Sequence, residues 1–94
     1  MHAGYEVVDR NWRVKAGEID LVLRRGGLVV FAEVKARASD AFGDPASAVG
    51  HQKRARLHRL AAMWLDAMNV HGVEIRFDVV SVLGVRVTVI EAAF

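Results

Sequence analysis

Asp20, Glu33 and Lys35 are the residues of this sequence whose types and spacing could support hydrolytic chemistry. Each interrupts a short stretch of branched apolar residues typical of a β-strand, in which alternate side chains point to one face. Glu33 and Lys35 then share a face, as do Glu18 and Asp20. If the two strands pair with Asp20 opposite Glu33, all four polar groups converge, with facing Cβ atoms about 5 Å apart. A slip of one residue would place the two pairs on opposite faces.

Two carboxylates held this close repel each other unless a cation lies between them. Asp20 and Glu33 offer hard oxygen ligands that suit Mg²⁺ or Mn²⁺, and the sequence has no cysteine to favour a softer metal. The ion would supply Lewis acidity and a nucleophilic water, while Lys35 could orient that water or stabilise charge on a phosphate. Phosphodiester hydrolysis needs these components. The alternative is a solvated polar edge, in which Glu18 and Lys35 form a cross-strand ion pair.

The elements that must position these residues follow from the hydrophobic pattern. Strands are predicted over 18–24 and 28–35, joined by a tight turn at Arg25-Gly26-Gly27. The second strand has few polar residues on either face, so we expect it near the centre of a covered sheet.

One long amphipathic helix is predicted over about 46–69, because apolar residues recur there at steps of three and four. Asp44-Pro45 resembles its N-terminal cap, and His71-Gly72 is expected to end it. The region 36–45 is predicted to be a loop. Trp64 lies on the apolar face and is expected in the core.

The remaining segments complete a mixed sheet. Strands are expected near 73–82 and 85–91, with Gly84 at the turn between them, and 5–9 is a weak first strand. The predicted fold class is α/β, with a mixed β-sheet and the long helix packed across one face. The chain of 94 residues has room for one domain, over 1–94.

Composition excludes several classes of protein. Without cysteine there is neither a disulfide framework nor a cysteine-based zinc site. No apolar run approaches the roughly 20 residues of a membrane helix, so we expect no membrane contact. The first residues lack the profile of a signal peptide, which makes the cytoplasm the expected compartment.

A basic segment stands out against a formal net charge of only +2. No acidic residue lies between Asp44 and Asp66, so its cations have no partner one helical turn away. We expect them to contact the backbone of a nucleic acid, although a solvent-facing stripe is the alternative. The histidines of the segment are assigned to the stripe rather than to a metal site. The residues assigned to this surface are Lys53, Arg54, Arg56, Arg59 and, from the preceding loop, Arg37, with His51 and His58 in the stripe.

Two segments resemble the core of the PD-(D/E)XK nuclease superfamily: Gly17-Glu18-Ile19-Asp20-Leu21-Val22 and Phe31-Ala32-Glu33-Val34-Lys35-Ala36-Arg37. More narrowly, the chain resembles the YraN-type proteins, a family related to archaeal Holliday-junction resolvases. Further matching segments run through nearly the whole chain: Arg10-Asn11-Trp12-Arg13, Phe42-Gly43-Asp44-Pro45, Lys53, Arg76-Phe77-Asp78-Val79-Val80 and Ala93-Phe94.

The resemblance implies a restriction-endonuclease-like fold and a set of site residues. Asp20 and Glu33 would ligate the metal, the backbone carbonyl of Val34 would be a further ligand, and Lys35 would be catalytic. Gln52 lies where related nucleases often carry an accessory polar residue, and Glu18 is a second supporting residue. The family normally begins with a further N-terminal helix that bears a Glu. This sequence starts at what resembles the end of that helix, and on that basis we expect a homodimer or a catalytically weak form.

Two functions of different classes are therefore expected. The first is a metal-dependent endonuclease, with DNA favoured over RNA and branched or single-stranded forms as the candidate substrates. The alternative is a non-catalytic nucleic-acid-binding or assembly module that keeps the nuclease fold, and a purely structural domain ranks last. Trp12 could stack on a base but is expected to pack under the sheet. Asp78 is expected to hydrogen-bond a neighbouring strand rather than to act in catalysis.

Overall fold

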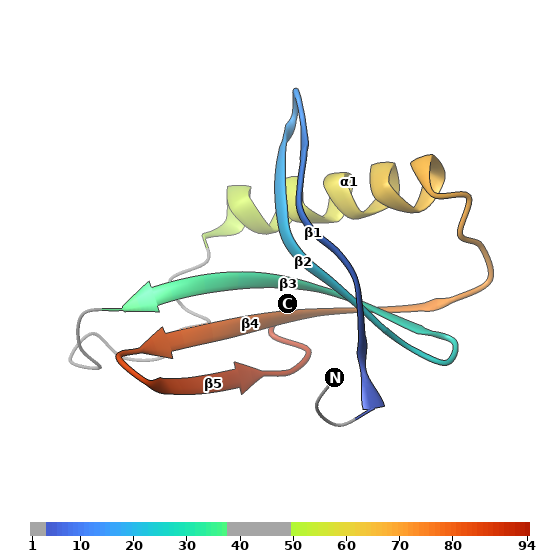
Figure 1. The fold of residues 1–94 in the computed structure, drawn as a ribbon. Helices are drawn as coiled ribbons and strands as arrows, with labels where there is room; N and C mark the ends of the chain where they lie inside the picture. Colours follow the sequence, from blue (N-terminus) through green and yellow to red (C-terminus); the bar gives the residue numbers. More distant parts are fainter. Residues whose placement is uncertain (1–3, 38–49) are drawn as a thin grey trace.

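The computed structural model of this protein describes residues 4–37 and 50–94. Its strands form one five-stranded sheet in the order β1-β2-β3-β4-β5, and a single helix in the described part packs across it (Figure 1). The predicted α/β class, a mixed sheet with one long helix on a face, is confirmed. The elements are β1 Glu6–Val14, β2 Gly17–Arg25, β3 Leu28–Arg37, α1 His51–Ala67, β4 Glu74–Leu83 and β5 Arg86–Ile90.

The β2–β3 hairpin has the register on which the predicted cluster depends. Gly26, with φ 57°, makes the reversal in a backbone conformation that glycine adopts readily. The paired residues run from Arg25 opposite Leu28 to Leu21 opposite Ala32. The pairing follows the predicted register and ends one residue before Asp20 and Glu33.

β3 lies at the centre of the sheet, as predicted. It pairs with β2 in antiparallel fashion and with β4 in parallel fashion. The parallel pairing requires a crossover, and α1 lies within the chain that makes it. Val29 and Val30 are fully buried although they point to opposite faces, so both faces of β3 are covered.

The helix differs from its prediction at both ends. Residues 46–49 and the predicted cap at Asp44-Pro45 lie outside the described residues, and α1 starts at His51. It ends at Ala67, earlier than the predicted stop at His71-Gly72, because Asn69 already adopts a left-handed conformation with φ 55°. Asparagine tolerates this conformation just beyond a helix end.

The first strand is longer than the predicted 5–9 and reaches Val14. Two irregularities interrupt its alternation of side chains. The register with β2 shifts between Val7 and Asp9, and Asn11 has a positive φ of 50°. A bulge of this kind breaks the period-two pattern from which strands are predicted.

Trp64 ties the helix to the sheet. It is buried in the core, as predicted, and its ring meets Phe31 edge-on at 5.7 Å. Its Nε1 donates a hydrogen bond of 2.8 Å to Asp9 Oδ2, which links α1 to the outermost strand β1. Trp12 packs against the same core, as expected for a residue under the sheet.

Asp78 is a structural anchor, but its partners lie on its own strand β4 and beyond the end of β5 rather than on a neighbouring strand as predicted. It is buried at 2% exposure and accepts two hydrogen bonds from Arg76, at 2.8 and 2.9 Å. Its Oδ1 also accepts from the Ala92 amide at 3.0 Å. Since Arg76 donates in turn to the Tyr5 hydroxyl, one buried carboxylate connects segments from both ends of the described chain. No helix of the described residues is both long and apolar enough to cross a membrane.

Candidate active site

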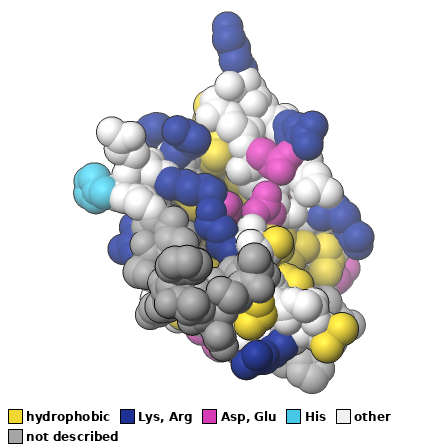
Figure 2. Space-filling model, turned by 90° about the vertical axis from the view of Figure 1, so that its left-hand side faces the viewer, with side chains coloured by type: hydrophobic (Ala, Val, Ile, Leu, Met, Phe, Trp, Pro, Cys, Tyr) yellow, Lys and Arg dark blue, Asp and Glu magenta, His cyan; other side chains and the backbone are white. Residues whose placement is uncertain are grey.

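A pocket of about 230 Å³ collects the predicted acidic residues between β2, β3 and α1. On the face of the molecule that holds it, acidic side chains lie beside a broad group of Lys and Arg side chains (Figure 2). Carboxylates from two strands therefore face cations from the helix. The pocket is lined by Glu18, Asp20, Glu33, Lys53, Arg56, Leu57 and Leu60.

Asp20 lies where β2 and β3 separate. The two strands pair as far as Leu21 and Ala32, and beyond that point β2 continues with β1 as a ribbon directed away from β3 (Figure 1). The Asp20 carboxylate then takes the place of a strand carbonyl, because its Oδ2 accepts the Val34 amide at 2.9 Å. A side chain is thus fixed at the opening between the strands, where backbone pairing would otherwise continue.

Gly17 allows the start of β2 to approach the helix closely. A Cβ atom at this position would lie 3.1 Å from Leu60 Cδ1 and 3.4 Å from Arg56 Cδ. Its φ of 147° is also one that residues with a side chain rarely adopt. A residue other than glycine would be strained here and would press on the Leu60 and Arg56 side chains, which line the pocket.

Glu33 is the most enclosed carboxylate of the pocket, with 7% exposure. Lys53 Nζ lies 2.5 Å from Glu33 Oε1, and Lys35 Nζ lies 3.7 Å from the same oxygen. Lys35 is therefore beside the predicted carboxylates, as the alternation along β3 requires. Lys53, which sequence reasoning assigned only to a nucleic-acid surface, reaches into the site from the first turn of α1.

The sequence contains a pattern from which the inward orientation of Lys53 could have been predicted. Leu57 and Leu60, both buried, follow it by four and seven residues, which is the spacing of one helix face. Lys53 therefore points toward the sheet together with the apolar residues of that face.

The charges of the site shift one another's pKa values. Burial, together with the nearby charges of Glu33 and Glu18, raises the pKa of Asp20, and the hydrogen bond from the Val34 amide opposes that change. Interaction with Lys53, followed by burial, lowers the pKa of Lys35. Interaction with Glu33 raises the pKa of Lys53. Two carboxylates and two ammonium groups thus form one interacting cluster.

Glu18 does not pair with Lys35, so the cross-strand ion pair suggested as an alternative is wrong. It pairs instead with Arg13, which lies directly opposite on β1. The Arg13 guanidinium holds the pKa of Glu18 below its usual range. Glu18 still lines the pocket and interacts with Asp20, which fits a supporting position.

The predicted basic surface is divided by the geometry of the helix. Lys53 and Arg56 line the pocket, whereas Arg54 lies over the Phe94 ring, 5.5 Å from its centre. Arg59 is exposed on the helix. Arg37 ends β3, and its side chain lies outside the described residues.

The remaining predicted residues of the helix do not join the pocket. His58 packs its ring 4.1 Å from that of Phe77, so it is part of an aromatic cluster rather than a metal site. His51 and Gln52 are exposed at the start of α1, and neither lines the pocket. The accessory role that the family resemblance implies for Gln52 therefore stays a prediction.

The chemistry of the site suits a hard divalent cation. Within the described ranges, no three residues among His, Cys, Asp and Glu are grouped as a metal cage. Mg²⁺ does not need one, because it usually keeps several waters and binds through one or two carboxylates and the substrate phosphates. Asp20 and Glu33 line one pocket, and the Glu33 carboxylate already pairs with one positive charge, the ammonium of Lys53. The residues present therefore fit Mg²⁺ or Mn²⁺.

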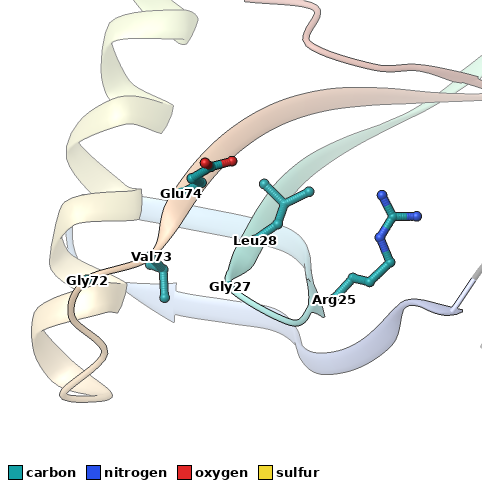
Figure 3. A pocket seen from close by; sticks show the side chains of 6 residues that line it. All are labelled: Arg25, Gly27, Leu28, Gly72, Val73 and Glu74. Carbon is teal, nitrogen blue, oxygen red and sulfur yellow. The ribbon is translucent and has the colours of Figure 1, made fainter.

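A larger hollow of about 580 Å³ lies at the other end of β3. It is formed by the β2–β3 turn and the connection from α1 to β4, and its charged side chains, Arg25 and Glu74, lie on separate strands (Figure 3). The other lining residues are Gly27, Leu28, Gly72 and Val73. It gathers no cluster of carboxylates comparable with that around Asp20 and Glu33.

Fold and pocket define a small α/β domain with a mixed sheet and a charged site at the opening between two central strands. The chain belongs to the family described as Uncharacterised protein family UPF0102, whose sequence model matches residues 1–82. This confirms the YraN-type resemblance.

Relatives from several bacteria support the assignment. A UPF0102 protein of Beutenbergia cavernae is 57% identical over 88% of this chain and 70% of its own length. One from Nocardia farcinica is 51% identical over 86% of this chain and 64% of its own length. One from Syntrophus aciditrophicus is 40% identical over 98% of this chain and 76% of its own length. The chain thus spans roughly two thirds to three quarters of each of these relatives.

Proposed function

We propose that this protein is a divalent-metal-dependent nuclease domain that hydrolyses phosphodiester bonds of nucleic acid, with DNA favoured over RNA. One observation carries the proposal: Asp20 and Glu33 line one pocket where two central strands separate, and Lys35 lies 3.7 Å from Glu33. The resemblance of these residues to the PD-(D/E)XK core supports the same function. Branched and single-stranded DNA are the first substrates to examine.

Asp20 and Glu33 would hold Mg²⁺ or Mn²⁺, with the backbone carbonyl of Val34 as a further ligand. The bound ion would supply Lewis acidity and lower the pKa of a water. Lys35 would orient the attacking water or stabilise negative charge on the phosphate. Arg56, at the rim of the pocket, would hold the nucleic-acid backbone.

A second function is favoured by a different observation. Lys53 already neutralises Glu33 at 2.5 Å, and such a contact would also suit a site that no longer binds metal. The protein would then be a non-catalytic nucleic-acid-binding or assembly module that retains the nuclease fold. Its basic helix would bind phosphates, and Asp20 would contribute nothing to that binding.

Calorimetric titration of Mn²⁺ separates the two functions. The protein is titrated beside Asp20→Asn and beside Glu74→Gln, which removes an exposed carboxylate of the other hollow. The nuclease proposal expects one ion per chain in the parent and in Glu74→Gln, and none in Asp20→Asn. Cleavage of branched, single-stranded and duplex DNA and of RNA is then assayed with Mg²⁺ or Mn²⁺. Cleavage by Asp20→Asn at the parental rate would exclude the proposed chemistry, and metal-independent DNA binding without cleavage would favour the binding module.

A further inference from the structure

We propose that Lys53 is an internal counter-cation of the site, which neutralises Glu33 in the metal-free protein and leaves it when a divalent cation binds. The inference rests on the proposed function, since it assumes that the pocket binds metal. It adds a role for a helix residue that the metal-binding motif does not contain. Three features of the structure carry it.

The first feature is that Glu33 needs a cation. A carboxylate with only 7% exposure is costly to keep ionised unless a positive charge and hydrogen bonds compensate for lost hydration. Lys53 provides this compensation, because its Nζ lies 2.5 Å from Glu33 Oε1. Lys35 contributes less, from 3.7 Å.

The second feature is crowding of positive charge. Both ammonium groups approach the same oxygen of Glu33, Lys53 at 2.5 Å and Lys35 at 3.7 Å, and two like charges this close repel each other. A divalent ion bound to Glu33 would repel both lysines from a few ångströms away. One lysine must therefore withdraw before metal and carboxylate can meet.

The third feature identifies Lys53 as the lysine that withdraws. Lys35 lies on β3, two residues from Glu33, so the strand fixes it on the same face. Lys53 reaches Glu33 from a different element, the first turn of α1, and its side chain is more exposed, at 37% against 26%. Its four-carbon stem can turn to solvent without any change in the backbone. Withdrawn, it stays at the rim of the pocket, where a phosphate would approach.

Removal of Lys53 should then strengthen metal binding, because the ion no longer has to break an ion pair. For a partly exposed pair we expect Lys53→Met to bind Mn²⁺ roughly three- to tenfold more tightly than the parent. The metal-free variant should melt at a lower temperature, and Mn²⁺ should raise its melting temperature by more than it raises that of the parent. Arg59→Met removes an exposed cation from the same helix and is the matched control. Lys53→Gln, which keeps a polar group beside Glu33, serves as a second variant if Lys53→Met does not fold.

The experiment is calorimetric titration of Mn²⁺ and thermal melting with and without Mn²⁺, for the parent, both Lys53 variants and Arg59→Met. If a Lys53 variant binds Mn²⁺ more tightly and Arg59→Met keeps the parental affinity, the replacement of Lys53 by the metal ion at Glu33 is supported. Parental or weaker affinity in folded Lys53 variants overturns it while leaving the proposed function intact. Equal tightening in Arg59→Met also overturns it, because general charge would then explain the effect. If neither parent nor Lys53 variants bind Mn²⁺, both proposals fail together.

Discussion

At the scale of single residues, the environment of the Asp20 carboxylate acts on its pKa in opposing directions. The Val34 amide donates to it at 2.9 Å, which favours the ionised form. Burial and the charges of Glu33 and Glu18 favour the protonated form and outweigh that bond, so the pKa of Asp20 is raised. Without a divalent ion, this residue is therefore held in a position that does not suit its charge. A carboxylate with a raised pKa that lines a pocket is a candidate functional residue.

Asp20→Asn should consequently stabilise the metal-free protein at neutral pH. The amide oxygen of Asn can still accept the Val34 amide, and the unfavourable charge is gone. In the parent, the folded state binds the Asp20 proton more tightly than the unfolded state does. The stability from this group is thus present below its ordinary pKa of about 4 and is lost as pH rises through the raised value.

Thermal unfolding in EDTA between pH 3 and pH 7 would measure the effect. The melting temperature of Asp20→Asn should exceed that of the parent at pH 7, and the difference should shrink toward pH 3. Mn²⁺ should reverse the order, because it can stabilise only the parent. A variant less stable than the parent at pH 7 without metal would contradict the assigned direction of the pKa shift.

Strand alternation was enough to predict that Asp20 and Glu33 share one pocket and that Lys35 lies beside Glu33, while the roles of these residues stay predictions. Asp20, Glu33 and Lys35 follow from a period of two and one register. The partner of Glu18 could not be found in the same way, because the predicted first strand ended at residue 9 and never brought Arg13 opposite Glu18. Lys53 was missed for another reason: it was grouped with neighbouring cations, although its spacing to Leu57 and Leu60 placed it on the inward face.

At the scale of elements, α1 serves both the core and the site. Its inward side chains Leu57, Leu60, Ala61 and Trp64 are buried against the sheet. Leu57 and Leu60 also line the pocket beside Lys53. The position of Lys53 relative to Glu33 therefore depends on how firmly these leucines hold the helix against β2 and β3.

Leu60→Ala tests this dependence. Leu60 is 1% exposed, and the loss of a buried leucine costs about 2–5 kcal/mol of the free energy of unfolding. Met63→Ala, on the same helix at 42% exposure, should cost less than about 1 kcal/mol. Urea unfolding followed by circular dichroism would give both values. A cost for Leu60→Ala no greater than that for Met63→Ala would mean that the inward face of α1 does not anchor the helix.

The elements themselves were largely predictable, and their ends were not. Apolar periodicity gave the helix and the central hairpin, since these features depend on many residues at once. The end of α1 depends on the single left-handed residue Asn69, and the extent of β1 depends on a bulge near Val7 and Asp9. Each of these features depends on the backbone conformation of one or two residues. The apolar periodicity, which is spread over many residues, does not reveal it.

At the scale of the whole molecule, the distribution of charge matters more than the net value of +2. The basic segment predicted as one stripe is split by α1 between the pocket and the C-terminal residues. Arg56 lines the pocket, whereas Arg54 is half-buried over the Phe94 ring. If the pocket is where a polyanion binds, these two cations, two positions apart in the sequence, should contribute differently.

Salt dependence of DNA binding measures that difference. Each phosphate neutralised by a side chain releases counterions, so the slope of log K against log salt falls by about one when such a contact is removed. Arg56→Ala should weaken binding and reduce the slope by about one. Arg54→Ala should leave the slope near the parental value and lower the melting temperature instead, because it removes the contact of Arg54 with the Phe94 ring. Fluorescence anisotropy with labelled DNA in EDTA, over a series of KCl concentrations, would give both slopes.

Equal losses in the two variants would mean that the helix binds as an undivided stripe. Unchanged slopes in both would place the nucleic-acid surface away from the pocket and remove Arg56 from the proposed mechanism.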